Sequence, residues 1–304
     1  MKRPTAGGAR SRRRQWSWGA LTVGAFLGGL LLVGLVLLWP GSEEKPPPGS
    51  SVFSPPAPAG LPGATDHPAG GNVEGPTAPR LAIVVADLGY DPVRDAEWLR
   101  FPEKLTVSVL PFGPSSRNIA SSAQERGFCV LVNVPMEPEN PTATSDGTGP
   151  FRLRRGMTES EMEAAFERMA GDIPMAAGAS NYMGSAFTAD PAAMASFAEV
   201  LKKRGFFFLD SLTAQGSVGL EAARRAGVPS LGRDVFLDDD TRPAEIRRQW
   251  ARALALAKER GEAVLICHSR PETYKAVIEM LPDLRKEGIR TVTVQELLAD
   301  PQKG

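Results

Sequence analysis

One apolar run constrains the fold of this chain more than any other stretch of its sequence. Residues Leu81 to Ala86 are all apolar, and the run ends in a single carboxylate, Asp87. An apolar run without polar alternation is typical of a strand buried on both faces, as in a parallel sheet. Ligands of parallel sheets bind at the carboxyl ends of the strands. Asp87 is therefore either a pocket residue or the cap of a following helix.

Further apolar runs also end in polar residues, which favours the pocket. The polar residues that follow these runs are Asn133, Asp210-Ser211 and His268-Ser269. Because the carboxyl ends of parallel strands meet at one edge of a sheet, this repetition indicates one shared site.

Short apolar runs alternate with helical patterns from Arg80 to about Ala299. We expect strands over Leu81–Ala86, Leu105–Leu110, Phe128–Val134, Ala176–Ser180, Phe206–Leu209, Val228–Leu231, Ala263–Cys267 and Thr291–Val294. We expect helices over Ser115–Arg126, Glu159–Ala170, Pro191–Arg204, Ser217–Ala226, Pro243–Arg260 and Glu272–Glu287. Repeated strand–helix units predict an α/β fold with a mostly parallel sheet, open or closed into a barrel. Roughly seven or eight strands in about 220 residues favour a (β/α) barrel over a Rossmann sheet.

The longest break in this alternation runs from Glu137 to Gly156 and is polar and rich in Pro and Gly. A loop of that length in a compact domain is usually functional. Because it follows the third expected strand, we predict that it lies over the mouth of the pocket.

The amino-terminal part of the chain differs in composition from the rest. A basic tail, 1–15, precedes an uncharged apolar stretch from Trp16 to Trp39. That stretch is long enough to span a bilayer, and its Trp residues stand where interfacial aromatics belong. Because a basic flank stays in the cytoplasm, we predict a single-pass protein of a bacterial inner membrane, with the barrel facing the periplasm. A cleaved signal peptide is the alternative, but no small-x-small site follows Trp39.

Residues 40–79 are mostly Pro, Gly, Ser and Ala, with almost no large apolar side chains. Such a segment cannot bury enough surface to fold, so we expect a disordered linker there and one domain over 80–304. The whole chain has 35 basic and 35 acidic residues. This balance leaves no basic footprint for nucleic acid.

The two cysteines are expected to be buried thiols. Cys129 shares strand parity with Asn133 and should point inward, whereas Cys267 should point outward if its neighbour His268 points inward. These directions do not fit disulfide geometry, so we predict no bridge, even in an oxidising compartment.

His268 is the only histidine in residues 80–304. A catalytic zinc normally takes at least two His ligands, or Cys in their place, and this domain does not supply that set. A Ser–His–Asp hydrolase remains arithmetically possible, because serines stand at predicted strand ends: Ser185, Ser211 and Ser269. No G-x-S-x-G elbow accompanies them, which argues against that class.

Five motifs stand in order between Arg80 and Leu298. They are Val85-Ala86-Asp87-Leu88-Gly89-Tyr90, Pro135-Met136-Glu137-Pro138, Asn181-Tyr182-Met183-Gly184-Ser185, Leu209-Asp210-Ser211 and Arg233-Asp234-Val235-Phe236-Leu237-Asp238. Together they resemble the divergent polysaccharide deacetylases, outlying relatives of the NodB-type carbohydrate esterases. The resemblance implies a distorted (β/α) barrel and an acetylated-glycan substrate class, which points to cell-envelope polysaccharide or peptidoglycan as the partner.

The resemblance also implies a mechanism. In NodB-like enzymes a metal-bound water attacks the N-acetyl carbonyl, one Asp is the base, a second Asp and two His hold the metal, and a late His is the acid. Here the first Asp position holds Ala86, and the two metal-binding His positions hold Asn133 and Tyr182. Asp87 and His268 remain. We therefore predict no metal site and no cofactor; zinc or another divalent metal is expected only if an altered site is active.

The candidate catalytic residues are Asp87 and His268. The candidate substrate-binding residues are Asn133, Glu137, Asn181, Tyr182, Asp210, Ser211, Arg233 and Asp234. Some also have plainer interpretations, namely Glu137 as a loop former, Asp210 as a helix cap and Arg233-Asp234 as a buried ion pair. The acidic run Asp238-Asp239-Asp240 is interpreted as a solvated helix start.

Two functions stay open, and with them the question of whether the protein is an enzyme. The first is a degenerate deacetylase-like barrel that is tethered to the membrane and binds glycan or an envelope protein partner. The second is an active N-deacetylase of acetylated amino-sugar polymers with an altered site. The joint loss of the base and both imidazoles favours the first.

Overall fold

The computed structural model describes residues 78–140 and 151–299, and the strands in those ranges form one sheet. The strands are β1 (Arg80–Leu88), β2 (Thr106–Val109), β3 (Cys129–Met136), β4 (Gly178–Met183), β5 (Phe207–Asp210), β6 (Ser230–Gly232), β7 (Val235–Phe236), β8 (Glu262–His268) and β9 (Arg290–Val292). The helices are α2 (Pro92–Trp98), α3 (Ser116–Glu125), α4 (Glu159–Asp172), α5 (Pro191–Arg204), α6 (Gly219–Arg225), α7 (Pro243–Arg260), α8 (Pro271–Lys286) and α9 (Val294–Leu298).

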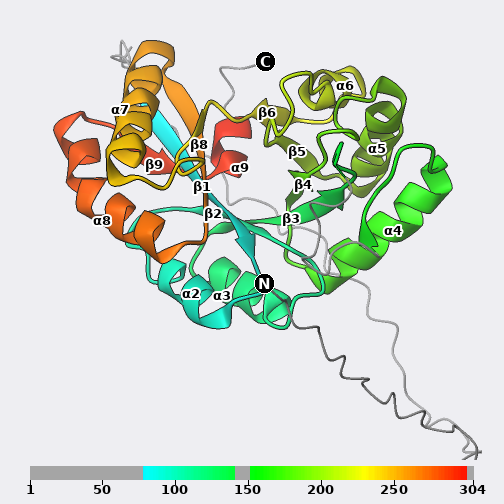
Figure 1. Cartoon of the computed structure of the whole chain (residues 1–304), viewed down its shortest axis with the longest axis horizontal. Coiled ribbons are helices and arrows are strands. Elements are labelled where there is room, and N and C mark those ends of the chain that lie inside the picture. The colour runs from blue at the N-terminus through cyan, green and yellow to red at the C-terminus, as the bar shows by residue number, and fades with distance from the viewer. Residues whose placement is uncertain (1–77, 141–150, 300–304) are drawn as a thin grey trace, which may run out of the picture. The chain divides into compact units, whose positions relative to one another are not determined.

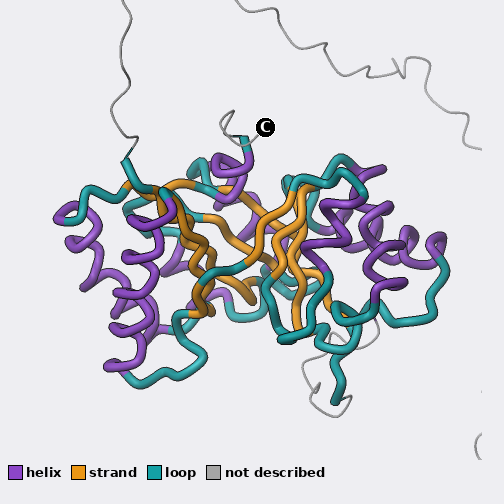
Figure 2. The backbone as a smooth tube through the Cα atoms, turned by 90° about the horizontal axis from the view of Figure 1, so that it is seen from above, coloured by secondary structure: helices purple, strands orange, loops and turns teal. Residues whose placement is uncertain are grey.

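The sheet curls so far that two neighbouring residues of the chain, Arg233 and Asp234, form hydrogen bonds to strands on either side of its opening. The strand order is β6-β5-β4-β3-β2-β1-β8-β7, with β9 paired to the start of β1, and the paired strands are parallel. The backbone N–H of Arg233 donates to Asp210 of β5 at 3.0 Å, and that of Asp234 donates to Val264 of β8 at 2.9 Å. The predicted parallel α/β architecture is confirmed as a curled, incomplete barrel (Figure 2), whose end strands β6 and β7 do not pair with each other.

Apolar clusters lie on both faces of the curled sheet. The inner cluster gathers side chains from β1, β3, β5 and β8, and α9 inserts Val294 and Leu297 into it. The backbone N–H of Val294 donates to Thr106 Oγ1, at the start of β2, at 2.9 Å. α9 therefore fills the curl at the amino ends of the strands, while the other helices cover the outer face (Figure 1). This arrangement leaves the carboxyl ends of the strands open to solvent.

Local end signals explain why two helices were predicted to the residue. Asp190 caps α5 by accepting backbone hydrogen bonds at 2.9 and 3.0 Å, Pro191 opens the helix, and Gly205 closes it with φ 72°. α7 opens at Pro243 and is followed by Gly261 with φ 81°. Proline at the first turn and glycine in the left-handed conformation after the last are strong boundary signals.

The expected strands all correspond to observed ones, but three short elements were not predicted. β7 has only two residues, and α2 and α9 have seven and five. Elements of this length carry too little periodicity to be recognised from the pattern of apolar residues.

Both cysteines are free and buried, as predicted. Cys129 belongs to the inner cluster and Cys267 to the outer one, so the two thiols lie on opposite faces of the sheet. Burial raises the pKa of Cys129 to about 12 and the pKa of Cys267 well above its usual value. Neither thiol is therefore a nucleophile at neutral pH.

Other sequence predictions fall outside the described ranges. The membrane span over 16–39 and the linker over 40–79 lie before them, apart from the last two linker residues. Among the helices of residues 78–140 and 151–299, none is both long and apolar enough to cross a bilayer. The polar loop is described at its two ends, 137–140 and 151–156.

The plug formed by α9 gives a stability prediction. Leu297 is fully buried in the inner cluster, so Leu297→Ala should lower the free energy of unfolding by about 2 to 5 kcal/mol, through lost burial and a new cavity. Urea denaturation of residues 80–304 measures this change. The matched control is Gln295→Ala on the exposed face of the same helix, which should stay within about 0.5 kcal/mol of the parent. Equal effects of both variants would contradict the plug.

Candidate functional site

A pocket of about 600 Å³ opens at the carboxyl ends of the strands. Its walls come from β1, β3, β4 and β8 and from the segments that follow β5 and β6. The lining residues are Ala86, Asp87, Asn133, Asn181, Tyr182, Met183, Ser211, Leu212, Thr213, Arg233, Phe236, Asp239, Ile266 and His268. Most of the sequence-predicted site residues are thus brought together here.

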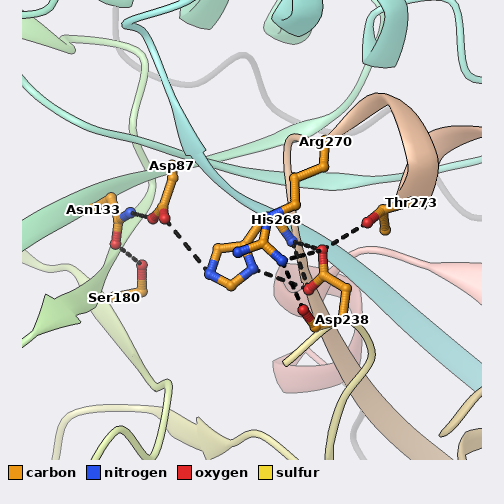
Figure 3. Close-up of polar contacts among 7 residues, drawn as sticks. All are labelled: Asp87, Asn133, Ser180, Asp238, His268, Arg270 and Thr273. Atoms are coloured by element: carbon orange, nitrogen blue, oxygen red, sulfur yellow. Dashed lines mark hydrogen bonds and ion pairs between the residues drawn. The ribbon is translucent and has the colours of Figure 1, made fainter. Parts of the chain in front are cut away.

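Asp87 is aimed by an irregularity in β1. The pairing of β1 with β2 shifts register between Val85 and Leu88, and Asp87 has φ 67°, a left-handed conformation. Bulges of this kind re-aim side chains beside active sites. Asn133 Nδ2 donates to Asp87 Oδ1 at 2.8 Å, and His268 Nε2 lies 3.7 Å from Asp87 Oδ2 (Figure 3). Asp87 is therefore held between an amide and an imidazole.

His268 is held in turn by Asp238, whose side chain is fully buried. The ring Nδ1 of His268 lies 3.0 Å from Asp238 Oδ1, and the backbone N–H of His268 donates to the same carboxylate at 3.1 and 3.2 Å. Thr273 Oγ1 donates to Asp238 Oδ2 at 2.7 Å, and Arg270 Nη1 donates to the Asp238 carbonyl at 2.8 Å (Figure 3). These bonds fix the ring so that Nε2 faces Asp87.

The two carboxylates that flank His268 have opposite electrostatic environments. Burial raises the pKa of Asp87 above its usual 3.8, although His268 and the hydrogen bond from Asn133 act against this shift. Burial also acts to raise the pKa of Asp238, but the hydrogen bonds from His268 and Thr273 outweigh it and hold that pKa below 3.8. Two carboxyls whose pKa values are pushed apart are a common arrangement for acid–base work.

A buried polar chain fixes the amide of Asn133. Ser180 Oγ donates to Asn133 Oδ1 at 3.3 Å and is itself bonded to Ser108 Oγ. The amide oxygen therefore points toward Ser180, and the amide nitrogen points toward Asp87. Asn133 supplies a hydrogen-bond donor to Asp87, where a metal ligand would have to present a lone pair.

This donor set does not fit the divalent metal that the sequence resemblance implies for active relatives. Asp87 offers one carboxylate and His268 one imidazole, while Asn133 turns its NH₂ toward the site. Within residues 78–140 and 151–299, no group of three His, Cys, Asp or Glu side chains is placed to hold a metal. A catalytic metal needs about three protein ligands and an open position, and the side chains around Asp87 fall short of that number.

The part of the pocket wall beside His268 carries an aromatic ring, Phe236, and next to it a cation, Arg233. The ring of Phe236 lies with its centroid 4.9 Å from that of His268, and the Arg233 guanidinium lies 4.8 Å from the same Phe236 centroid. Asn181 links β4 to the segment that follows β5, because its side-chain amide donates to Met183 and Thr213 and accepts from the backbone N–H of Ser211. Tyr182 also lines the pocket.

Three predicted substrate-binding residues do not line the pocket. Asp210 is fully buried and accepts from Leu212 N, Ser217 Oγ and Leu220 N, so its alternative interpretation as a cap is the correct one. Glu137 bonds to the backbone and side chain of Arg155 at 2.8 and 2.9 Å and shapes the polar loop, again as its alternative had it. Asp234 accepts from Arg260 and Val264.

The predicted Arg233-Asp234 ion pair is wrong, because the backbone between the two residues crosses from β5 to β8 and turns their side chains apart. The Arg233 side chain donates to the carbonyls of Ser211 and Leu212 at 2.7 and 3.0 Å. Asp234 pairs with Arg260 at 3.2 Å.

The interpretation of the acidic run as a solvated helix start is wrong for Asp238. Asp239 and Asp240, which precede α7, are exposed as this interpretation expects. Asp238, in contrast, is buried against His268. The sequence held one signal for it, since Asp238 ends the motif that begins at Arg233. Phe236, which lies in the same motif, and the Ser108–Ser180 pair were missed as site residues, because their contacts with His268 and Asn133 are made across the sheet.

The remaining candidates are also placed by the structure. Ser269 Oγ donates to the buried Asp95 at 2.7 Å, and Ser185 Oγ accepts from Glu139 N at 2.9 Å, so these hydroxyls serve the scaffold. The described ends of the polar loop, 137–140 and 151–156, contribute no lining residue to the pocket. These two ends therefore do not cover the mouth of the pocket, contrary to the prediction, and the rest of the loop lies outside the described residues.

Asp87→Asn tests the electrostatics of the site. The folded protein binds a proton at Asp87 more tightly than the unfolded chain, so this group's contribution to stability is lost as pH rises from 3.8 through the raised pKa. Asparagine keeps the acceptor for Asn133 and tolerates φ 67°. The stability of Asp87→Asn relative to the parent should therefore increase from about pH 4 to about pH 8, measured by urea denaturation.

Asp240→Asn is the level control for this measurement. Arg242 lowers the pKa of the exposed Asp240 from 3.8 to about 2, so the contribution of this carboxylate changes below about pH 4, and the stability of this variant relative to the parent should stay level from about pH 4 to about pH 8. A flat or falling difference for Asp87→Asn would contradict a raised pKa at Asp87.

Known proteins resemble this chain over most of its length. The family model of the divergent polysaccharide deacetylases matches residues 83–298. YibQ, an uncharacterised protein of Escherichia coli (strain K12), is 34% identical over 225 residues, which cover 74% of this chain and 69% of YibQ. An uncharacterised protein of Haemophilus influenzae is 33% identical over 227 residues, which cover 73% of this chain and 80% of that protein. The crystal structure of the uncharacterised protein ATU2773 from Agrobacterium tumefaciens superposes with a TM-score of 0.69 at 26% identity, covering 74% of this chain and 91% of that one. This chain therefore belongs to the divergent polysaccharide deacetylase family.

Proposed function

We propose that this protein binds a saccharide of the cell envelope in the pocket and does not carry out metal-dependent deacetylation. The observation that carries the proposal is the orientation of Asn133, which donates to Asp87 from the place where the resemblance expects a metal-binding histidine. The same pocket has a volume of about 600 Å³ and polar groups in its lining, such as Asp87, Asn181 and Arg233. Family membership supports a glycan as the class of ligand.

The chemistry of the walls supports saccharide binding. Phe236 and Tyr182 offer apolar ring surface, while Asp87, Arg233 and His268 offer charged or polar groups around it. A concave site with a few convergent polar groups on apolar walls is the usual form of a small-molecule pocket. Sugar rings present both a C–H face and hydroxyl groups, so they match this mixture.

Titration calorimetry of residues 80–304 with chitooligosaccharides and peptidoglycan fragments tests the proposal. Tyr182→Ala should weaken binding about tenfold, because it removes an aromatic side chain from the pocket lining. Glu137→Gln is the matched control and should bind as the parent does, because Glu137 lies outside the lining. Acetate release should be absent with added zinc, cobalt or manganese. Near-stoichiometric metal together with acetate release abolished by Asp87→Ala would overturn the proposal.

A second function is favoured by one observation, the row formed by Asp87, His268 and Asp238. In a metal-independent hydrolase, Asp87 would take the proton of the attacking water and His268 would deliver a proton to the leaving nitrogen. The same assay separates the two functions. Acetate release that persists in a chelator and is lost in His268→Gln would establish the hydrolase.

We also propose that residues 16–39 anchor the protein in the inner membrane, with the barrel in the periplasm. The support is the Arg-rich flank and the uncharged run between Trp16 and Trp39. Protease added to spheroplasts should digest the barrel and spare a short amino-terminal fragment. A barrel that stays protected, in cells whose cytoplasmic marker is also protected, would rule this topology out.

A further inference from the structure

Arg233 is held at the pocket wall in a fixed position. Its backbone N–H bonds to β5, and its side chain donates from Nε to Ser211 O at 2.7 Å and from Nη2 to Leu212 O at 3.0 Å. Its guanidinium also lies over the ring of Phe236, which lines the same pocket. An arginine restrained on both sides loses little further freedom when it binds a ligand.

The charge of Arg233 is only partly compensated. A guanidinium has five N–H donors, and two of them are used by the loop carbonyls. Across the described ranges, no carboxylate lies within ion-pair distance of Arg233. Asp239 lines the same pocket and acts on the Arg233 charge from beyond ion-pair distance, and Asp210 accepts from a backbone N–H and from the Ser217 hydroxyl. Partial burial lowers the pKa of Arg233, as expected for a cation without a direct counterion.

We propose that Arg233 selects saccharides that carry a carboxylate, as uronic acids and lactyl-ether sugars do. The inference rests on the proposed function, since it names the chemistry of the ligand of the same pocket. A carboxylate would complete the donor set of Arg233 with charge-assisted hydrogen bonds. The ring of Phe236 contacts both this cation and His268, so the acidic group would bind beside the aromatic ring that also borders His268. Arg233 is thereby a specificity-determining residue.

The test compares two ligands that differ at one carboxyl group, which is ionised in the first and methylated, hence uncharged, in the second. The purified full chain is titrated with the disaccharide of N-acetylglucosamine and N-acetylmuramic acid and with its carboxyl methyl ester. The parent protein should bind the acid about tenfold more tightly than the ester, which corresponds to one charge-assisted contact. That preference should shrink as salt is added. Equal binding of acid and ester by the parent overturns the inference and leaves the proposed function standing. Binding of neither ligand, nor of neutral chitooligosaccharide, overturns both.

Variants assign the preference to Arg233. Arg233→Gln should bind acid and ester alike, and Arg233→Lys should keep part of the preference, because it keeps the charge without the planar fork. Arg260→Gln is the control at the same crossing; it removes the partner of Asp234 outside the pocket and should keep the full preference. A preference that survives Arg233→Gln overturns the inference. If Arg233→Gln does not fold, Arg233→Lys and the salt dependence of the parent decide. Tighter binding of a 6-phosphorylated chitobiose than of the acid would assign the subsite to phosphate and overturn the carboxylate.

Discussion

The site depends on a backbone crossing of two residues. Because Arg233 bonds to β5 and Asp234 to β8, separating the two sides of the curled sheet here would break at least one of these bonds. The crossing carries Phe236 and Asp238 onto the flank of β8, beside His268, and leaves Arg233 on the side of β5. The pocket is therefore assembled from segments far apart in the sequence by one turn of chain, while the packing of α9 keeps the opposite end of the curl filled.

Within that frame, the buried carboxylate of Asp238 determines the geometry of the reactive groups. A fully buried charge is tolerated only when hydrogen bonds replace its hydration, and here backbone, imidazole and hydroxyl donors do so. The cost of moving any one of them is high, so His268 has one orientation. Asp87 is held from the other side by Asn133, whose amide is oriented by a serine pair. The family's architecture thus survives in this member, with hydrogen bonding where the resemblance expects coordination.

Much of the fold could be predicted from the local sequence. For α5 and α7, the proline at the first turn and the glycine after the last turn mark the ends of each helix. The site followed only in part. Asp87 and His268 were identifiable because an apolar strand ends at each of them. Asp238 was not, because a run of three acidic residues looks solvated until β8, some thirty residues further on, is placed beside it. The direction of the Asn133 amide depends on Ser180, a neighbour across the sheet, and no local pattern encodes such a contact.

The two thiols on opposite faces of the sheet have a consequence for how the chain must fold. Two strands separate β3 from β8, so no disulfide joins Cys129 to Cys267 in the native state. In an exported chain, any bridge between them would form before the sheet closes and would hold the chain in a non-native topology. If the chain is exported as proposed, its strands must pair before the two thiols oxidise. Once the strands have paired, both sulfurs are buried, so the folded barrel should have the same structure in oxidising and reducing surroundings.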